Sequence, residues 1–117
     1  MNSTILRDLG RCSYPVAFRL QEELSSRLSD RSNSTRKREN VILLCEHDPV
    51  YTYGRRSAKI DTNEEENRLR SLGASTYKSN RGGLITFHGP GQLVCYPIVD
   101  LREWKDCVLR EVLLATE

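Results

Sequence analysis

One stretch of the sequence combines residue types that could bind and position a reactive group. It covers residues 81–101 and reads RGGLITFHGPGQLVCYPIVDL. Arg81 precedes the pair Gly82-Gly83, and glycines let a backbone reach positive φ values and approach a ligand closely. An arginine beside such a pair can hold a carbonyl or phosphate oxygen. We expect Arg81 to face the surface, so that Arg81→Ala weakens ligand binding and costs little stability.

The residues after the glycine pair predict a strand with two different faces. Alternation places Leu84, Thr86 and His88 on one face. Ile85 and Phe87 then share the other face. The first face combines hydrogen-bonding groups with an apolar residue, which suits an acyl chain that ends in a polar carbonyl.

The glycine-rich bend that follows, HGPGQ, allows two interpretations. It directs His88 and Gln92 toward the same opening, as a binding site would. From the residues alone, a structural hairpin with a buried histidine is the favoured alternative. The other histidine, His47, precedes Asp48-Pro49 and is interpreted as a turn residue. Two histidines do not complete a metal site, so none is predicted.

The remaining patterns predict an α+β fold with helices and strands interleaved. Apolar residues at every fourth position from Val16 to Leu28, after Pro15, indicate an amphipathic helix. A second helix is expected from Asn63, with Gly73 ending it, and a third from Trp104. Polar residues 30–40 suggest a loop, residues 54–56 a turn, and no element is predicted before Ser13. Strands are predicted at residues 41–45, 50–53, 74–78, 84–87 and 93–99.

Composition restricts the class of protein. A length of 117 residues favours one domain. The net charge of +2 does not predict nucleic-acid binding, and no apolar run approaches the roughly 20 residues of a membrane span. The N-terminal arginines are interrupted by Asp8, so they give only a weak mitochondrial targeting signal.

The cysteines indicate structural thiols. Cys12, Cys45, Cys95 and Cys107 contain no C-x-x-C pair, which argues against a zinc ribbon or a thioredoxin-type motif. Cys45 and Cys95 lie in apolar runs, so we predict that both are free and buried, in a reducing compartment. Cys107 lies on the last predicted helix and is also interpreted as structural.

Two blocks of the sequence resemble the lipoyl(octanoyl) transferase family. Residues 81–101 resemble the family's signature, and residues 42–56, ILLCEHDPVYTYGRR, resemble the strand and loop before it. The resemblance implies a mixed β-sheet flanked by helices, shared with biotin and lipoate ligases. It also implies octanoyl transfer from octanoyl-acyl-carrier protein to a lysine of lipoyl domains, in 2-oxoacid dehydrogenases and the glycine cleavage H protein. No cofactor is implied, and the phrases are most similar to the eukaryotic, mitochondrial branch.

The resemblance also implies site residues. In the family a cysteine accepts the acyl group as a thioester, and a lysine lowers that cysteine's pKa. Both lie downstream of the signature, beyond Glu117, so we expect residues 1–117 to be the N-terminal part of a single catalytic domain, cut short and inactive alone. The implied substrate-binding residues are Arg81, Gly82, Gly83, Leu84, Ile85, Thr86, Phe87 and His88.

Two other functions remain open at this point. One is an ATP-using lipoate or biotin ligase, which the phrase HGPGQL disfavours. The other is a non-catalytic module that binds acyl groups or a partner. The pair Arg55-Arg56 fits either an acidic carrier or lipoyl domain, through charge steering, or an ordinary solvated turn.

Overall fold

The computed structural model describes residues 3–30, 32, 38–56, 63–79 and 81–103. Each of the five predicted strands is confirmed to within two residues at either end, as are the first two predicted helices. The helix predicted from Trp104, and most of the loop predicted at residues 30–40, lie outside the described residues. The elements are β1 (Ser3–Arg11), α1 (Tyr14–Ser29), β2 (Glu39–Glu46), β3 (Val50–Tyr53), α2 (Asn63–Ser71), β4 (Ser75–Lys78), β5 (Ile85–His88), β6 (Val94–Ile98) and the 3-10 helix η2 (Leu101–Glu103).

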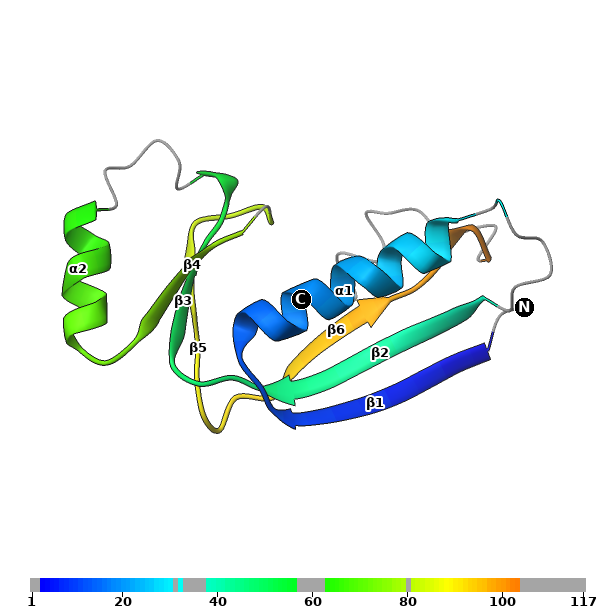
Figure 1. Cartoon of the computed structure of the whole chain (residues 1–117), viewed down its shortest axis with the longest axis horizontal. Helices are drawn as coiled ribbons and strands as arrows, with labels where there is room; N and C mark the ends of the chain where they lie inside the picture. Colours follow the sequence, from blue (N-terminus) through cyan, green and yellow to red (C-terminus); the bar gives the residue numbers. More distant parts are fainter. Residues whose placement is uncertain (1–2, 31, 33–37, 57–62, 80, 104–117) are drawn as a thin grey trace.

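The first sheet has the strand order β1-β2-β6 and is covered on one face by α1 (Figure 1). β2 pairs in parallel with β1 and antiparallel with β6. The apolar sequence of β2 suits this central position, because alternate residues can be buried against a helix. Leu24 of α1 packs against Val41 and Leu43, and these three form the buried cluster between the helix and this sheet. Pro15 lies in the first turn of α1, where its missing N–H costs no helical hydrogen bond.

The second sheet has the order β4-β3-β5 and stands at an angle to the first (Figure 1). β3 pairs in parallel with β4 and antiparallel with β5. α2 lies beside this sheet and buries Leu69. Gly73, with φ of +88°, follows the helix as expected for a helix end. The described residues therefore form two mixed sheets where one had been expected, both within an α+β architecture.

The strand β1 was not predicted from the sequence. Its apolar residues Ile5 and Leu9 are half-buried, but Arg7 and Asp8 between them interrupt the pattern. The parallel register with β2 stabilises the strand through backbone hydrogen bonds, which composition does not reveal. Its end is marked by Gly10, whose φ is +62° and whose N–H donates to Asp8 Oδ1 at 2.8 Å.

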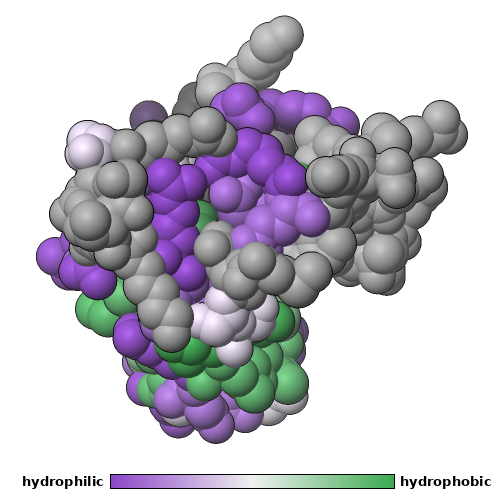
Figure 2. Space-filling view, turned by 90° about the vertical axis from the view of Figure 1, so that its right-hand side faces the viewer, coloured by the Kyte–Doolittle hydropathy of each residue, from purple (hydrophilic) through white to green (hydrophobic). Residues whose placement is uncertain are grey.

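The other face of the first sheet, away from α1, is partly apolar and open. Apolar residues gather on that side in the lower part of Figure 2. Leu6 is 63% exposed there, and Cys95 is exposed. The prediction that Cys95 is buried is therefore wrong: strand alternation turns Tyr96 toward the core and Cys95 away from it.

The prediction of an apolar stripe along the first helix is only partly correct. Leu24 and Leu28 are buried, but Val16 is 50% exposed because Tyr14 and Ala17 occupy the buried positions of the first turn. Among the described residues, no helix is both long and apolar enough to cross a bilayer.

Candidate functional site

Residues 81–84 form a loop that is held against the end of β3. The segment after β3 donates three backbone hydrogen bonds to it. Gly54 N–H donates to the Leu84 carbonyl at 3.1 Å, and Arg55 N–H donates to the Arg81 carbonyl at 2.9 Å. Arg56 N–H donates to the Gly83 carbonyl at 3.2 Å. The second sheet therefore fixes the position of the glycine pair, although the bonded residues are 26 to 30 positions apart in sequence.

The guanidinium of Arg81 holds its own loop in place. Its Nη2 donates to the Thr52 carbonyl at 2.6 Å and to the Leu84 carbonyl at 2.8 Å. Nη1 donates to the Gly82 carbonyl at 2.8 Å, and Nη2 and Nε both contact Thr52 Oγ1. Arg81 does hold carbonyl oxygens, as its residue type suggested, but they belong to the protein. The expectation that the Arg81 guanidinium faces the surface is therefore wrong, and these bonds lead us to predict a larger loss of stability for Arg81→Ala than the sequence suggested.

The glycines of this region have different roles. Gly83 has a φ of +93°, which favours glycine. A Cβ at Gly82 would meet no atom within 4 Å, so a ligand can approach the backbone there. The tightest packing is at Gly54, where a Cβ would lie 2.2 Å from the Gly83 carbonyl oxygen. Sequence analysis placed Gly54 only in a turn, because the atom it must avoid belongs to a loop distant in sequence.

The strand that follows the loop presents apolar side chains to solvent. Leu84 is 48% exposed, Ile85 is 38% exposed and Phe87 is 41% exposed. The Phe87 ring packs on Tyr51, with ring centroids 5.0 Å apart. It also lies over Gly89, where a Cβ would be only 2.6 Å from the ring. Alternation along β5 places Ile85 and Phe87 on one face, and Leu84, at the end of the loop, is exposed as well.

His88 lies apart from this surface. Its ring stacks on Tyr14 with centroids 6.2 Å apart, and the His47 ring is 6.1 Å away. The structure therefore places His88 among aromatic rings between the two sheets. Thr86, the other polar residue of the predicted face, is exposed and pairs with Thr52 across β3 and β5.

His47 lies in the short connection between β2 and β3, beside the bend at Asp48-Pro49, but its side chain is fully buried, which was not predicted from the sequence. Its Nδ1 lies 2.7 Å from the Cys12 carbonyl oxygen, and its Nε2 lies 2.9 Å from the Tyr96 hydroxyl. A signal was present in the sequence: His47 continues the alternation Val41, Leu43, Cys45 of the buried face of β2. The proline two residues later concealed that continuation.

The buried environment of His88 predicts a pH-dependent stability. Burial lowers the pKa of His88, and neighbouring His47 and Arg81 lower it further. The unfolded chain, with a histidine pKa of about 6.5, then binds the proton more tightly than the folded chain. The stability contributed by neutral His88 is present above about pH 6.5 and is lost as the pH falls toward the lowered pKa.

The measurement is the urea midpoint of the chain at about pH 7.5 and about pH 5. We expect the midpoint to fall at the lower pH, and to fall less in His88→Gln, which cannot titrate. An equal pH dependence in both proteins would contradict the assignment to His88.

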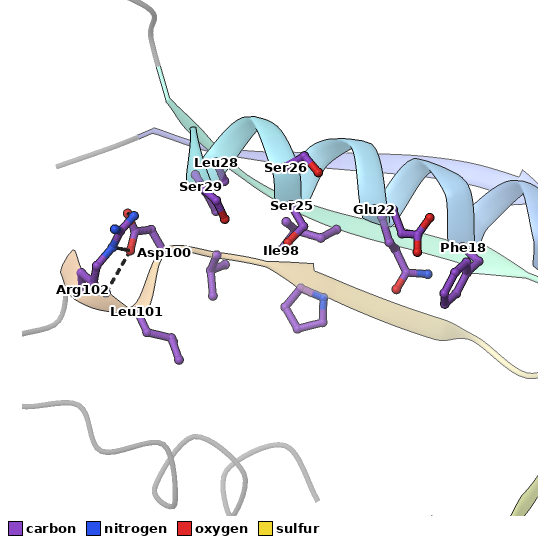
Figure 3. Close-up of a pocket in the computed structure, with 13 residues that line it drawn as sticks. Phe18, Glu22, Ser25, Ser26, Leu28, Ser29, Ile98, Asp100, Leu101 and Arg102 are labelled. Carbon is purple, nitrogen blue, oxygen red and sulfur yellow. Dashed lines mark hydrogen bonds and ion pairs between the residues drawn. The ribbon is translucent and has the colours of Figure 1, made fainter. Parts of the chain in front are cut away.

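A pocket lies elsewhere, between α1, β6 and η2 (Figure 3). Its volume is about 770 Å³, and none of residues 81–88 lines it. Serines 25, 26 and 29 of α1 contribute to its wall, as does the ion pair of Arg102 Nε with Asp100 Oδ1 at 2.6 Å. The lining also contains apolar residues such as Phe18 and Ile98, but no residue of the segment that resembles the family signature's substrate-binding part, so we place the candidate acyl site on the loop and β5.

Comparison with known proteins identifies the family. Residues 13–115 match the family described as the lipoyl protein ligase A/B catalytic domain, which is most of the chain. The chain belongs to this family. The predicted fold class, a mixed sheet arrangement with flanking helices as in lipoate ligases, is thereby confirmed.

Individual members of the family are similar over most of this chain. A mitochondrial octanoyl-[acyl-carrier-protein]:protein N-octanoyltransferase of Danio rerio is 52% identical over 101 residues, which cover 86% of this chain and 43% of the relative. An octanoyltransferase of Parabacteroides distasonis is 40% identical over 105 residues, which cover 90% of this chain and 48% of the relative. A solved structure of a T. acidophilum protein with bound lipoic acid covers 80% of this chain and 36% of that one, with TM-score 0.48 and 18% identity. The chain thus spans about half the length of the curated relatives it matches.

Proposed function

We propose that this chain supplies the octanoyl-binding part of a lipoyl(octanoyl) transferase. In that reaction an octanoyl group leaves octanoyl-acyl-carrier protein and is transferred to a lysine of a lipoyl domain. The names of the similar relatives support this assignment. The observation that carries it is that the fixed loop at residues 81–84 leads directly into β5, where Ile85 and Phe87 are exposed on one face.

The proposed site matches the two ends of an acyl thioester. Solvent-exposed apolar side chains next to each other are typical of a binding surface. An alkyl chain that covers them gains about 0.8 kcal/mol for each CH₂ removed from water. The carbonyl end can lie beside Gly82, because no side chain occupies the space there.

The same region of the structure also supports the proposed protein partners. Arg55 and Arg56 are exposed and lie directly beside the loop, since their N–H groups donate to it. Their charge can attract an acidic acyl-carrier protein or lipoyl domain as it approaches. Relatives of this chain occur in bacteria and, under mitochondrial names, in animals. For a eukaryotic chain we therefore propose the mitochondrion as its location.

We assign the residues of the loop and β5 to substrate binding and not to nucleophilic attack. Burial, together with neighbouring Cys12, raises the pKa of the Cys45 thiol to about 12. Cys45 is therefore protonated at neutral pH, whereas thioester exchange requires a thiolate. Cys95 lies on β6 of the first sheet, whereas the loop and its apolar surface belong to the second sheet.

The experiment measures binding of octanoyl-acyl-carrier protein to the chain by calorimetry. We expect Phe87→Ala to weaken binding about tenfold, equivalent to about 1.4 kcal/mol, because a large apolar contact with the acyl chain is lost. Leu6→Ala is the matched control, since Leu6 is an exposed apolar residue on the distant strand β1. Equal affinity for the carrier with and without its octanoyl group would contradict the proposal, as would equal weakening by both substitutions.

A further inference from the structure

Three potential metal ligands meet where the ends of β1 and β2 lie side by side. The thiols of Cys12 and Cys45 and the imidazole of His47 have ligand atoms within 4.8 Å of one another. They lie outside the proposed acyl-binding surface. We propose that Cys12, Cys45 and His47 bind one thiophilic divalent cation of the zinc class.

The fold brings these residues together by strand pairing. Arg11 at the end of β1 is in register with Glu46 of β2, and Cys12 N–H donates to the Glu46 carbonyl at 2.9 Å. Cys12 is thereby fixed beside the last residues of β2. Cys45 and His47, two positions apart, are both buried on the same side.

The spacing fits a tetrahedral centre. Cys45 Sγ lies 3.6 Å from His47 Nε2. Zinc–sulfur bonds of about 2.3 Å and zinc–nitrogen bonds of about 2.0 Å place adjacent ligand atoms about 3.6 Å apart. Cys45 and His47 therefore need almost no rearrangement to bind the same cation. Cys12 Sγ needs only a small movement, because all three ligand atoms already lie within 4.8 Å.

The histidine is held in the tautomer that a metal requires. His47 Nδ1 lies 2.7 Å from the Cys12 carbonyl oxygen. A carbonyl can only accept, so Nδ1 carries the proton and donates it. Nε2 then presents its lone pair toward Cys45, and a fixed second nitrogen of this kind is typical of metal-binding histidines. The Tyr96 hydroxyl, which donates to Nε2 at 2.9 Å, gives up that hydrogen bond when the cation binds.

The ligand chemistry selects the cation. Two thiols and an imidazole favour zinc-class ions over calcium or magnesium, which prefer oxygen. On binding, M²⁺ replaces the two S–H protons, which leave to solvent, so two thiolates and a neutral imidazole balance the charge. A neutral centre suits this buried position. Cys12 is only half-buried and gives the cation, and a water as fourth ligand, a route from solvent.

The test uses the reduced, full-length 117-residue chain titrated with Co²⁺ alone. Cobalt bound by thiolates shows an intense sulfur-to-metal absorption that oxygen-bound cobalt lacks. We expect this band to saturate at one cobalt per chain and to disappear when Zn²⁺ is added. The double variant Cys95→Ser/Cys107→Ser is the matched control: it keeps only Cys12 and Cys45 as thiols and should keep the full band.

Variants of the ligands separate a metal site from ordinary core packing. Cys12→Ser, at a half-buried position, should weaken cobalt binding at least about 100-fold while circular dichroism still shows the folded chain. Cys45→Ala should have the same effect on the band. The proposal is overturned if the double control variant lacks the sulfur band. It is also overturned if Cys12→Ser keeps the band at wild-type affinity, or if cobalt binds without any sulfur band, which is an adventitious ion only.

Discussion

Gly54→Ala is expected to push the loop at residues 81–84 away from β3. The new Cβ would lie 2.2 Å from the Gly83 carbonyl oxygen and 2.8 Å from that of Gly82. Both are backbone atoms, so the clash is relieved only by moving the loop. That movement strains or breaks the hydrogen bond from Gly54 N–H to the Leu84 carbonyl, and the neighbouring bonds that Arg55 and Arg56 donate to the loop. We expect a loss of about 1–3 kcal/mol in the free energy of unfolding, the usual range for overpacking.

Gly82→Ala is the matched control for this substitution. A Cβ at Gly82 meets no atom within 4 Å, and Gly82 does not have a positive φ. The free energy of unfolding of Gly82→Ala should therefore lie within about 0.5 kcal/mol of the wild-type value. Urea unfolding of both variants checks the prediction, and octanoyl-carrier binding should be lost with Gly54→Ala. A wild-type midpoint for Gly54→Ala would show that the loop is not held where the structure places it.

Arg81→Ala is expected to cost about 3 kcal/mol of stability, since hydrogen bonds to charged groups contribute about 1.5–3 kcal/mol each. The substitution removes the donors to the Thr52 and Leu84 carbonyls. Thr52 is fully buried, and the bond to Arg81 links its carbonyl to the loop. Arg81→Lys should recover only part of the lost stability, because one ammonium group cannot reproduce the planar arrangement of donors in the guanidinium.

The measurement is again urea unfolding, with Arg19→Ala as control because Arg19 is an exposed arginine on α1. Arg19→Ala should change the free energy of unfolding by no more than about 0.5 kcal/mol. If Arg81→Ala were equally neutral, the guanidinium would be facing solvent and would be available to a ligand, as the sequence alone suggested.

Local patterns in the sequence were sufficient to place most elements. The apolar run of β2, the helix that begins at Asn63 and the strand after Gly82-Gly83 all follow from short-range periodicity and turn residues. The apolar residues Leu84, Ile85 and Phe87 were likewise assigned to the site from alternation and family resemblance.

The features that were missed depend on contacts between distant segments. β1 is stabilised by pairing with β2, more than 30 residues away, and its own sequence carries charges. Gly54 is constrained by Gly83, and Arg81 is bound by Thr52. Because no local pattern records these partners, the sequence suggested a surface-facing arginine, whereas the structure binds its guanidinium to β3 and the loop.

The central claim, that the acyl chain lies on the loop and β5, can be tested by photocrosslinking. An acyl-carrier protein loaded with an octanoyl group that ends in a diazirine is bound to the chain, irradiated and mapped by mass spectrometry. We predict crosslinks within residues 81–88, with Phe87 prominent, and their loss when unlabelled octanoyl-carrier protein competes. Crosslinks concentrated instead on the groove between α1 and β6, at residues such as Phe18 and Ile98, would contradict the assignment.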